Sequence, residues 1–252
     1  MSVAPGGGLR VQDAMPHEQM DEQQTAAYLH MDRQELVRLA QRKKIPARKT
    51  PRGFVFRKGA VEQWVERQIH LLDADRLEEI ERGVSAHHGL PADELLITPL
   101  IPLKGLLVPL PAKTRSSAIR ALVRMASQAG LVHDEAHLVE EVEAREELCS
   151  TAIMPGVALP HPRHPLPYDI TASFVVAGVT ASGIPFGAPD GTLARLLMLI
   201  CCKDERTHLH VLARLARILH DEASVDEMVS AADADELRRT ILGREHTALG
   251  NL

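Results

Sequence analysis

The most restrictive stretch of this sequence is a histidine enclosed by two prolines at the end of a short apolar run. The stretch is Gly156-Val-Ala-Leu-Pro-His-Pro-Arg-His-Pro165. Pro160 and Pro162 fix their own φ angles and push the residues before them, Leu159 and His161, toward extended backbone. The sequence therefore predicts that a stiff loop just past a strand presents the imidazole of His161. A neutral imidazole at cell pH can serve as a nucleophile, a base or a metal ligand, or it can merely cap a loop.

The overall composition is typical of a soluble globular protein. The chain has 252 residues, enough for one ordinary domain and a small one, with 45% hydrophobic and 25% charged residues. Residues 1–20 lack the apolar core of a signal peptide, and the longest apolar run, 196–202, is too short to cross a bilayer. We expect a cytoplasmic protein with no membrane contact and no cofactor, and with buried thiols at Cys201 and Cys202.

Charge is distributed unevenly along the chain. The formal net charge is −5, yet residues 33–58 hold ten Lys and Arg against a single acid, Glu35. The rest of the chain then carries 19 basic and 33 acidic residues. This asymmetry predicts a module that faces nucleic acid, attached to an acidic partner domain.

The basic region divides into short elements. Asp32 is suited to begin a helix over 33–43, and Pro46 stops its continuation. Further helices are expected at 24–29 and 58–69, and the turn residues at 50–53 predict a hairpin, or wing, that runs into 54–56.

The segment TAAYLHMDRQELVRLAQRKKIPARKTPRGFVFRKGAVEQWV resembles the excisionase/MerR-like winged helix-turn-helix family. The resemblance implies duplex DNA as a partner and a recognition helix at 33–42. It places Arg33, Gln34 and Arg38 nearest the bases. On the wing, it implies that Arg48, Lys49 and Arg52 contact phosphates. The alternative is a basic module that docks a protein.

The C-terminal region alternates strand-like and helix-like segments. Strands are expected at 106–110, 171–179 and 196–202, and helices at 114–129 and 134–148, with Gly130 ending the first helix. Such alternation predicts an α/β domain in which helices cover a sheet.

A further helix is expected after residue 206, with Thr207 as its N-cap. At 100° per residue, His208 lies at the centre of the apolar stripe, while His210 turns toward water beside Arg214 and Arg217. A histidine in the first turn of a helix is well placed to meet an anion. A core histidine bonded to a neighbouring carbonyl is the alternative.

Two segments together, REELCSTAIMPGVALPHPR from Arg145 and RTHLHVLARLARILHDE from Arg206, point to a known family. From about Thr98 to Arg244 the chain resembles the IIA component of the bacterial phosphoenolpyruvate-dependent phosphotransferase system, in its fructose/mannitol and nitrogen-regulatory (PtsN-like) branch. The resemblance implies a mixed sheet of about five strands between helices. It also implies that His161 is the phosphoacceptor, His208 the second site histidine and Arg145 a source of positive charge.

The implied activity is phosphoryl relay by a phosphohistidine carrier rather than by a turnover enzyme. The donor would be an HPr-like phosphocarrier, and a separate IIB component or a regulated protein is a further partner. No metal is required. Pro162 departs from the family, which has a small residue there, because proline removes a backbone N–H that could bond the phosphoryl group.

The sequence leaves several alternatives open. The chain is a regulator that couples phosphorylation to DNA binding, an ordinary IIA carrier whose basic module docks proteins, or a DNA-binding regulator whose IIA domain no longer transfers phosphate. A zinc site built from His161, His164, His208 and His210 is a rival from another class.

The predicted organisation has four parts. Residues 1–20 are expected to be disordered, 21–69 form the winged helix-turn-helix domain, 70–96 a connecting helix and linker, and 97–246 the IIA-like domain. The connecting helix, 73–88, either orients the two domains or pairs two chains in a homodimer.

Overall fold

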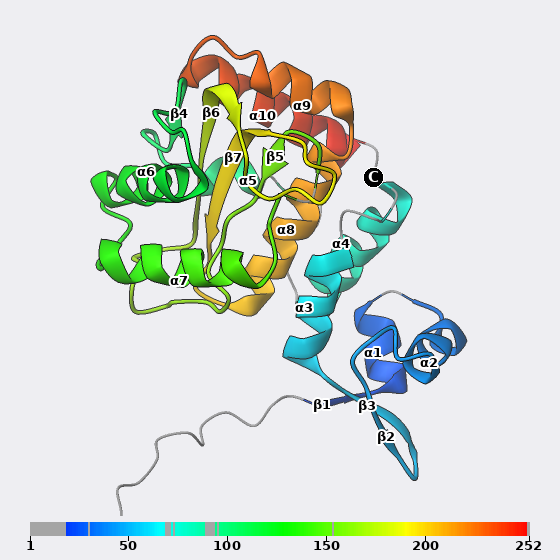
Figure 1. The fold of residues 1–252 in the computed structure, drawn as a ribbon. Coiled ribbons are helices and arrows are strands. Elements are labelled where there is room, and N and C mark those ends of the chain that lie inside the picture. Colours follow the sequence, from blue (N-terminus) through cyan, green and yellow to red (C-terminus); the bar gives the residue numbers. More distant parts are fainter. Residues whose placement is uncertain are drawn as a thin grey trace, which may run out of the picture. The chain divides into compact units, whose positions relative to one another are not determined.

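The computed structural model describes residues 19–29, 31–68, 72, 74–88, 94, 96–152 and 154–250. The chain divides into two compact units, an N-terminal one that ends at residue 65 and a C-terminal one from residue 66 that also takes in residues 28–30 (Figure 1). Most of the predicted disordered segment, residues 1–18, lies outside the described residues. None of the helices in the described ranges is long and apolar enough to span a membrane.

The N-terminal unit combines three helices with a small antiparallel sheet. In chain order the elements are β1 (Gln19–Asp21), α1 (Glu22–Tyr28), α2 (Arg33–Gln41), β2 (Arg48–Thr50), β3 (Gly53–Arg57) and α3 (Lys58–Gln68). The strand order is β1-β3-β2, so β2 and β3 form the predicted wing. Asp32 caps α2, as predicted, by accepting the backbone N–H groups of Gln34 and Glu35. Strand β1 was not predicted, because three residues show no measurable periodicity.

The C-terminal unit is a mixed sheet with helices on both faces. Its elements are α4 (Ala74–His88), α5 (Ile97–Leu100), β4 (Leu106–Leu107), α6 (Arg115–Gln128), α7 (Glu135–Leu148), β5 (Val157–Ala158), β6 (Phe174–Ile184), β7 (Ala194–Cys201), α8 (Glu205–Leu219), α9 (Glu222–Val229) and α10 (Ala234–Gly250). The strand order is β4-β6-β7-β5, with β6 and β7 antiparallel and both outer strands parallel to their neighbours. The mixed α/β architecture is confirmed, with four strands in the described part of the chain where about five were expected.

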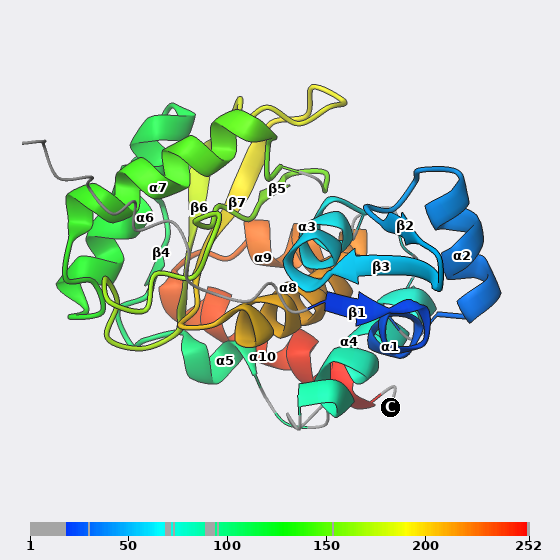
Figure 2. The same ribbon diagram turned by 90° about the horizontal axis from the view of Figure 1, so that it is seen from below.

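The central strands have two buried faces. Leu196, Met198 and Ile200 of β7 belong to the core shared with α8, α9 and α10. Leu197 and Cys201 of the same strand belong to the core shared with α6 and α7. Figures 1 and 2 show the resulting layers, with α6 and α7 on one face of the sheet and α8 to α10 on the other. A strand covered on both faces reads as a continuous apolar run, which is why 196–202 has no alternation.

The predicted connecting helix, α4, packs along α8 within this unit. Leu77 and Ile80 of α4 are buried, and Glu81, which follows Ile80, is 1% exposed. Glu81 accepts hydrogen bonds from Arg214 Nε at 2.5 Å and from Arg217 Nη1 at 2.7 Å. Burial by itself would raise the pKa of Glu81, but the hydrogen bond from His210 and the charges of the two arginines together lower it.

The predicted orientation of His210 toward water is therefore wrong. His210 is 1% exposed and Arg214 is fully buried. The Nε2 atom of His210 lies 3.1 Å from Ser85 Oγ and 3.3 Å from a Glu81 carboxylate oxygen. The helical wheel correctly placed His208 and His210 on different faces of α8. It contained no information about α4, which covers the polar face.

A second buried carboxylate, Glu245 of α10, completes this cluster. It accepts the backbone N–H groups of Leu96, Ile97 and Thr98 at the start of α5, and it lies 3.4 Å from Arg214 Nη1. Glu81, Arg214 and Glu245 thereby join α4, α8, α10 and the segment before α5 into one charged core.

Removal of Glu81 should destabilise the C-terminal unit strongly. Glu81→Ala leaves the buried Arg214 with one carboxylate fewer, and breaking a buried ion pair costs about 3–5 kcal/mol. Glu79→Ala is the matched control, because Glu79 lies two residues away, is 51% exposed and pairs with Arg76. Glu79→Ala should lower the free energy of unfolding by less than about 1 kcal/mol. Urea denaturation at pH 7 measures both, and equal losses would contradict the central place of Glu81.

The stabilisation by Glu81 has a defined pH dependence. The folded-state pKa of Glu81 is lowered from its ordinary value of 4.5. The stabilisation that ionised Glu81 provides is therefore fully present above the ordinary pKa, and it is lost as the pH falls through the folded-state pKa. The stability difference between the wild type and Glu81→Gln should narrow in acid.

Candidate functional site

The loop that carries His161 is fixed by the sheet. Strand β5 pairs with β7 in parallel, through Val157 with Leu196 and Ala158 with Leu197. Beyond the end of β5, the backbone N–H of Ile200 in β7 still donates to the carbonyl of Pro160 at 3.0 Å. The backbone therefore stays beside β7 as far as Pro160, and His161 follows it on a loop just past β5.

The geometry around His161 selects one tautomer of its imidazole. His161 is 4% exposed, and its Nδ1 lies 2.7 Å from the carbonyl oxygen of Leu159. A carbonyl oxygen only accepts hydrogen bonds, so Nδ1 carries the proton. The lone pair of the neutral ring then belongs to Nε2, and this makes Nε2 the nucleophilic nitrogen.

His208 lies against His161. The centroids of the two rings are 4.9 Å apart, and the ring planes are tilted by 54°. Helix α8 starts earlier than predicted, because its N-cap is Asp204, which accepts the backbone N–H of Thr207, and not Thr207 itself. The second predicted histidine thus sits within the first turn and is half-buried. The structure brings these two predicted residues together.

Arg145 occupies the last turn of α7. Its Nη1 donates to the carbonyl of Cys149 at 2.8 Å, and a basic side chain at this position stabilises the unpaired carbonyls at a helix end. The neighbouring Glu146, which was not predicted as a site residue, is buried beneath the loop that precedes β5 and accepts two hydrogen bonds from Thr151.

The residues that follow His161 differ in exposure. Pro162 is buried, whereas Arg163 and His164 are exposed. Arg163, two residues after His161 in the chain, is therefore an exposed cation.

The arrangement does not favour the zinc alternative. His208 lies beside His161, whereas His210 is held in the cluster of Glu81 and Ser85. Within the residues that the structure describes, no three His, Cys, Asp or Glu side chains come close enough to hold a metal ion.

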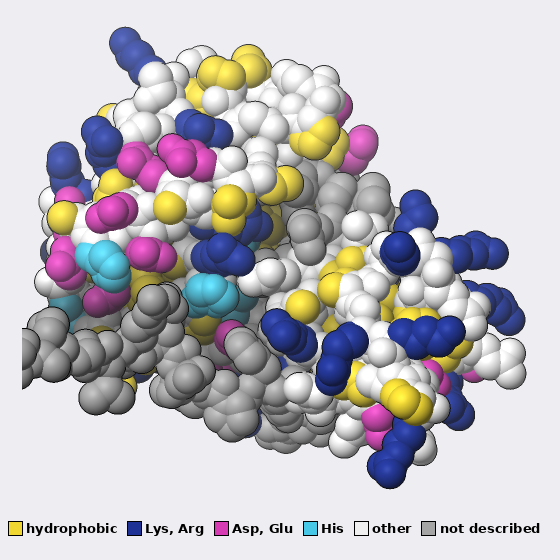
Figure 3. Space-filling view, turned by 60° about the horizontal axis from the view of Figure 1, so that its bottom comes forward, with side chains coloured by type: hydrophobic (Ala, Val, Ile, Leu, Met, Phe, Trp, Pro, Cys, Tyr) yellow, Lys and Arg dark blue, Asp and Glu magenta, His cyan; other side chains and the backbone are white. Residues whose placement is uncertain are grey.

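The predicted DNA-contacting residues all lie on the surface of the N-terminal unit. Each of the six is exposed: Arg33, Gln34 and Arg38 on α2, Arg48 and Lys49 on β2, and Arg52 at the wing turn. Lys and Arg side chains, dark blue in Figure 3, gather over this unit. The pattern fits a phosphate-binding surface.

Glu22 links the wing to α2. One of its oxygens accepts the backbone N–H of Phe54 at 2.8 Å, and the other pairs with the guanidinium of Arg33 at 2.8 Å. These two contacts, the Phe54 bond foremost, lower the pKa of Glu22. Gly53 has a φ of +121°, and a Cβ there would stand 2.5 Å from the Glu22 carboxylate. Glycine is therefore required at the base of the wing.

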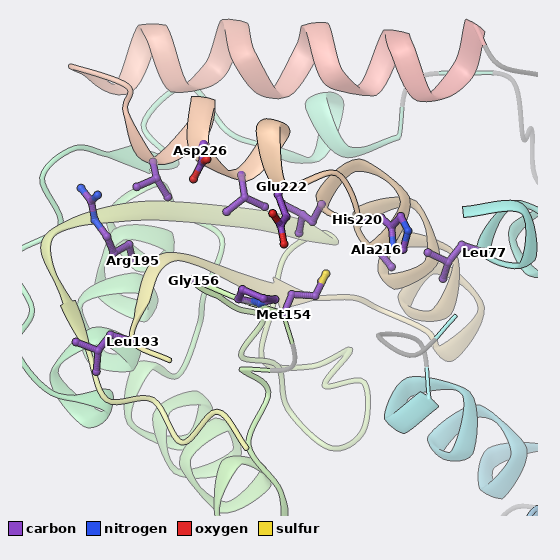
Figure 4. A pocket seen from close by; sticks show the side chains of 13 residues that line it. Leu77, Met154, Gly156, Leu193, Arg195, Ala216, His220, Glu222 and Asp226 are labelled. Atoms are coloured by element: carbon purple, nitrogen blue, oxygen red, sulfur yellow. The ribbon is translucent and has the colours of Figure 1, made fainter. Parts of the chain in front are cut away.

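A cavity of about 540 Å³ lies at the other end of α8 from His208. Figure 4 shows Glu222 and Asp226 of α9 and His220 around it, with Met154 and Gly156 along one wall. It contains neither histidine of the pair, and the candidate site is separate from it.

Comparison with known proteins supports the resemblance of both units. Residues 20–69 match the sequence model of a helix-turn-helix domain. The fructose-specific EIIA component of Haloferax volcanii is 28% identical over 137 residues, 54% of this chain and 87% of that protein. The fructose-specific EIIABC component of Bacillus subtilis is 26% identical over 143 residues, but the match spans only 22% of that protein.

Among solved structures, the nitrogen regulatory protein IIA-Ntr from Neisseria meningitidis has the same fold. Its TM-score is 0.53 at 23% sequence identity, and the match covers 58% of this chain and 99% of that one. The sequence model of the phosphoenolpyruvate-dependent sugar phosphotransferase system, EIIA 2, matches residues 103–243, more than half of the chain. With a helix-turn-helix domain before it, the chain belongs to this EIIA family.

Proposed function

We propose that the chain is a cytoplasmic regulator that accepts a phosphoryl group on Nε2 of His161 and binds duplex DNA through its N-terminal unit. The paired imidazoles support the first half: a proton fixed on Nδ1 of His161, and His208 4.9 Å away. The exposed basic residues of α2 and the wing support the second half. A family member that transfers phosphoryl groups would receive them from an HPr-like carrier and pass them to a IIB component or a regulated protein.

The transfer is an in-line displacement between two histidines. The lone pair of Nε2 forms a bond to phosphorus, the phosphorus–nitrogen bond of the donor breaks, and the donor nitrogen recovers its pair. The phosphorylated ring then holds phosphorus on Nε2 and a proton on Nδ1, and the carbonyl of Leu159 stabilises the resulting positive charge. His208 is proposed to hydrogen-bond the phosphoryl oxygens, and Arg163 or Arg145 to supply positive charge.

A second candidate function is DNA binding by a chain whose EIIA domain no longer transfers phosphoryl groups. Two observations favour it: the Nε2 atom of His161 is buried, and Pro162 offers no backbone N–H. Under the first proposal, docking of the carrier must open the surroundings of Nε2. The two candidates give opposite results when the chain is incubated with phosphoenolpyruvate, enzyme I and HPr.

Acid-labile phosphate should appear on the wild-type chain and disappear in His161→Ala, because His161 presents the nucleophilic nitrogen. His164→Ala removes an exposed histidine three residues away and should keep most of the label. His208→Ala should slow the transfer without abolishing it. Persistent labelling of His161→Ala would overturn the assignment, and an unlabelled wild type would favour the transfer-inactive candidate.

The full chain should bind duplex DNA with a strong dependence on salt. If the basic residues neutralise about four to six phosphates, log K should fall against log salt concentration with a slope of roughly −4 to −5. Arg52→Ala should weaken all duplexes alike, whereas Arg38→Ala should also reduce sequence preference. Fluorescence anisotropy at several salt concentrations measures both effects.

Arg239→Ala is the matched control for these variants. It removes one exposed positive charge from α10 of the C-terminal unit, so DNA affinity should not change. Binding that is independent of salt would instead favour a protein-docking role for the N-terminal unit.

Phosphorylation should change the DNA affinity. A phosphoryl group adds about −1.5 to −2 charges next to His208. Helix α8 carries His208 in its first turn and holds α4, the helix that follows α3 along the chain, through Glu81. Couplings of this kind amount to about 1–3 kcal/mol, a factor of about 5–150 in affinity.

The measurement compares the Kd of a selected duplex for phosphorylated and unmodified chain at one salt concentration. His161→Ala, treated with the same carrier proteins, corrects for their presence. Equal Kd values would show that the two units do not communicate.

A further inference from the structure

Glu146 is a buried carboxylate that accepts two hydrogen bonds from Thr151. It is 2% exposed, in the last turn of α7, next to Arg145. Its Oε1 accepts the backbone N–H of Thr151 at 2.9 Å, and its Oε2 accepts the Thr151 hydroxyl at 2.7 Å. Burial raises the pKa of Glu146, and the hydrogen bonds from Thr151 and Ser150 together with the charge of Arg145 oppose only part of that rise. An ionised group at this position therefore costs stability.

The bonds of Thr151 lead on to the histidine. The carbonyl of Thr151 accepts the backbone N–H of Leu159 at 3.2 Å, and the carbonyl of Leu159 accepts Nδ1–H of His161 at 2.7 Å. The sequence makes this path important, because Pro160 and Pro162 provide no N–H. Only Leu159 and His161 can donate backbone hydrogen bonds across residues 159–162. Thr151 thus anchors the backbone at Leu159, in addition to the bond from the N–H of Ile200 in β7 to the Pro160 carbonyl.

We propose that Glu146 is a positioning residue for the phosphoacceptor. By holding Thr151 it fixes the Leu159 carbonyl, and that carbonyl holds the proton of His161 on Nδ1 and leaves Nε2 nucleophilic. The inference rests on the proposed role of His161, but the tautomer can be measured without any phosphoryl transfer.

The first test is the tautomer of His161 in the full chain. Long-range ¹H–¹⁵N spectra of histidine-labelled protein at pH 8 distinguish a proton on Nδ1 from one on Nε2. The wild type should show the Nδ1–H form, and Glu146→Ala a mixture of both. Glu147→Ala, which removes the exposed carboxylate beside it, should leave the spectrum unchanged.

Two further variants separate positioning from folding. Glu146→Gln keeps an oxygen for the Thr151 N–H and buries no charge, so it should restore the Nδ1–H form and be at least as stable at neutral pH. Thr151→Val removes only the hydroxyl bond and should shift the tautomers partly. If Glu146→Ala does not fold, the His161 tautomer in Thr151→Val tests the proposal instead.

The second test is the rate of phosphorylation from HPr. Because small displacements of a reacting group reduce rates strongly, Glu146→Ala should be slower by about 10- to 100-fold. Glu146→Gln should stay within about threefold of the wild type.

The outcomes separate the two proposals. An unchanged tautomer in Glu146→Ala, or in Thr151→Val where the alanine variant does not fold, would overturn the positioning role even if phosphorylation slowed. A shifted tautomer together with an unlabelled wild type would instead reject phosphoryl acceptance and keep the positioning role.

Discussion

The C-terminal unit depends on an arginine that water does not reach. Arg214 is fully buried, so its charge requires compensation inside the protein, and Glu81 and Glu245 supply it from two different helices. An uncompensated charge in such a place would cost several kcal/mol. The requirement explains why a helix from the connecting segment is part of this unit. Residue 81 lies outside both matched regions, 20–69 and 103–243, yet the matched EIIA domain contains its partner arginines.

The sequence predicted well those elements whose causes are local. Asp32 before α2 and the turn residues of the wing act within a few positions, and the structure confirms what they indicated. Strand β7, which is buried from Leu196 onward, was recognised from its unbroken apolar run. His210 was predicted wrongly because the cover of a helix face depends on a segment more than a hundred residues away. A polar face of a helix indicates solvent or a polar partner, and periodicity cannot distinguish the two.

The candidate site shows the same division. His161 and His208 were predicted from their motifs, and the structure places their rings in contact distance. Glu146 was not predicted as a site residue, although it belongs to the REEL segment that begins at Arg145. A glutamate near the end of a helix predicts a solvated side chain, because carboxylates are seldom fully buried. Its burial follows from the loop 150–152 folding back over α7, and no local signal reveals that return.

The contact of Glu22 with both Phe54 and Arg33 has a consequence for any duplex that the N-terminal unit binds. A single carboxylate contacts both the wing base and the first residue of α2. A reader of DNA whose two contact elements are already aligned loses less conformational entropy on association than one whose elements must be ordered by the duplex. In the proposed DNA-binding role, the placement of α2 next to the wing is thus prepared in the free protein.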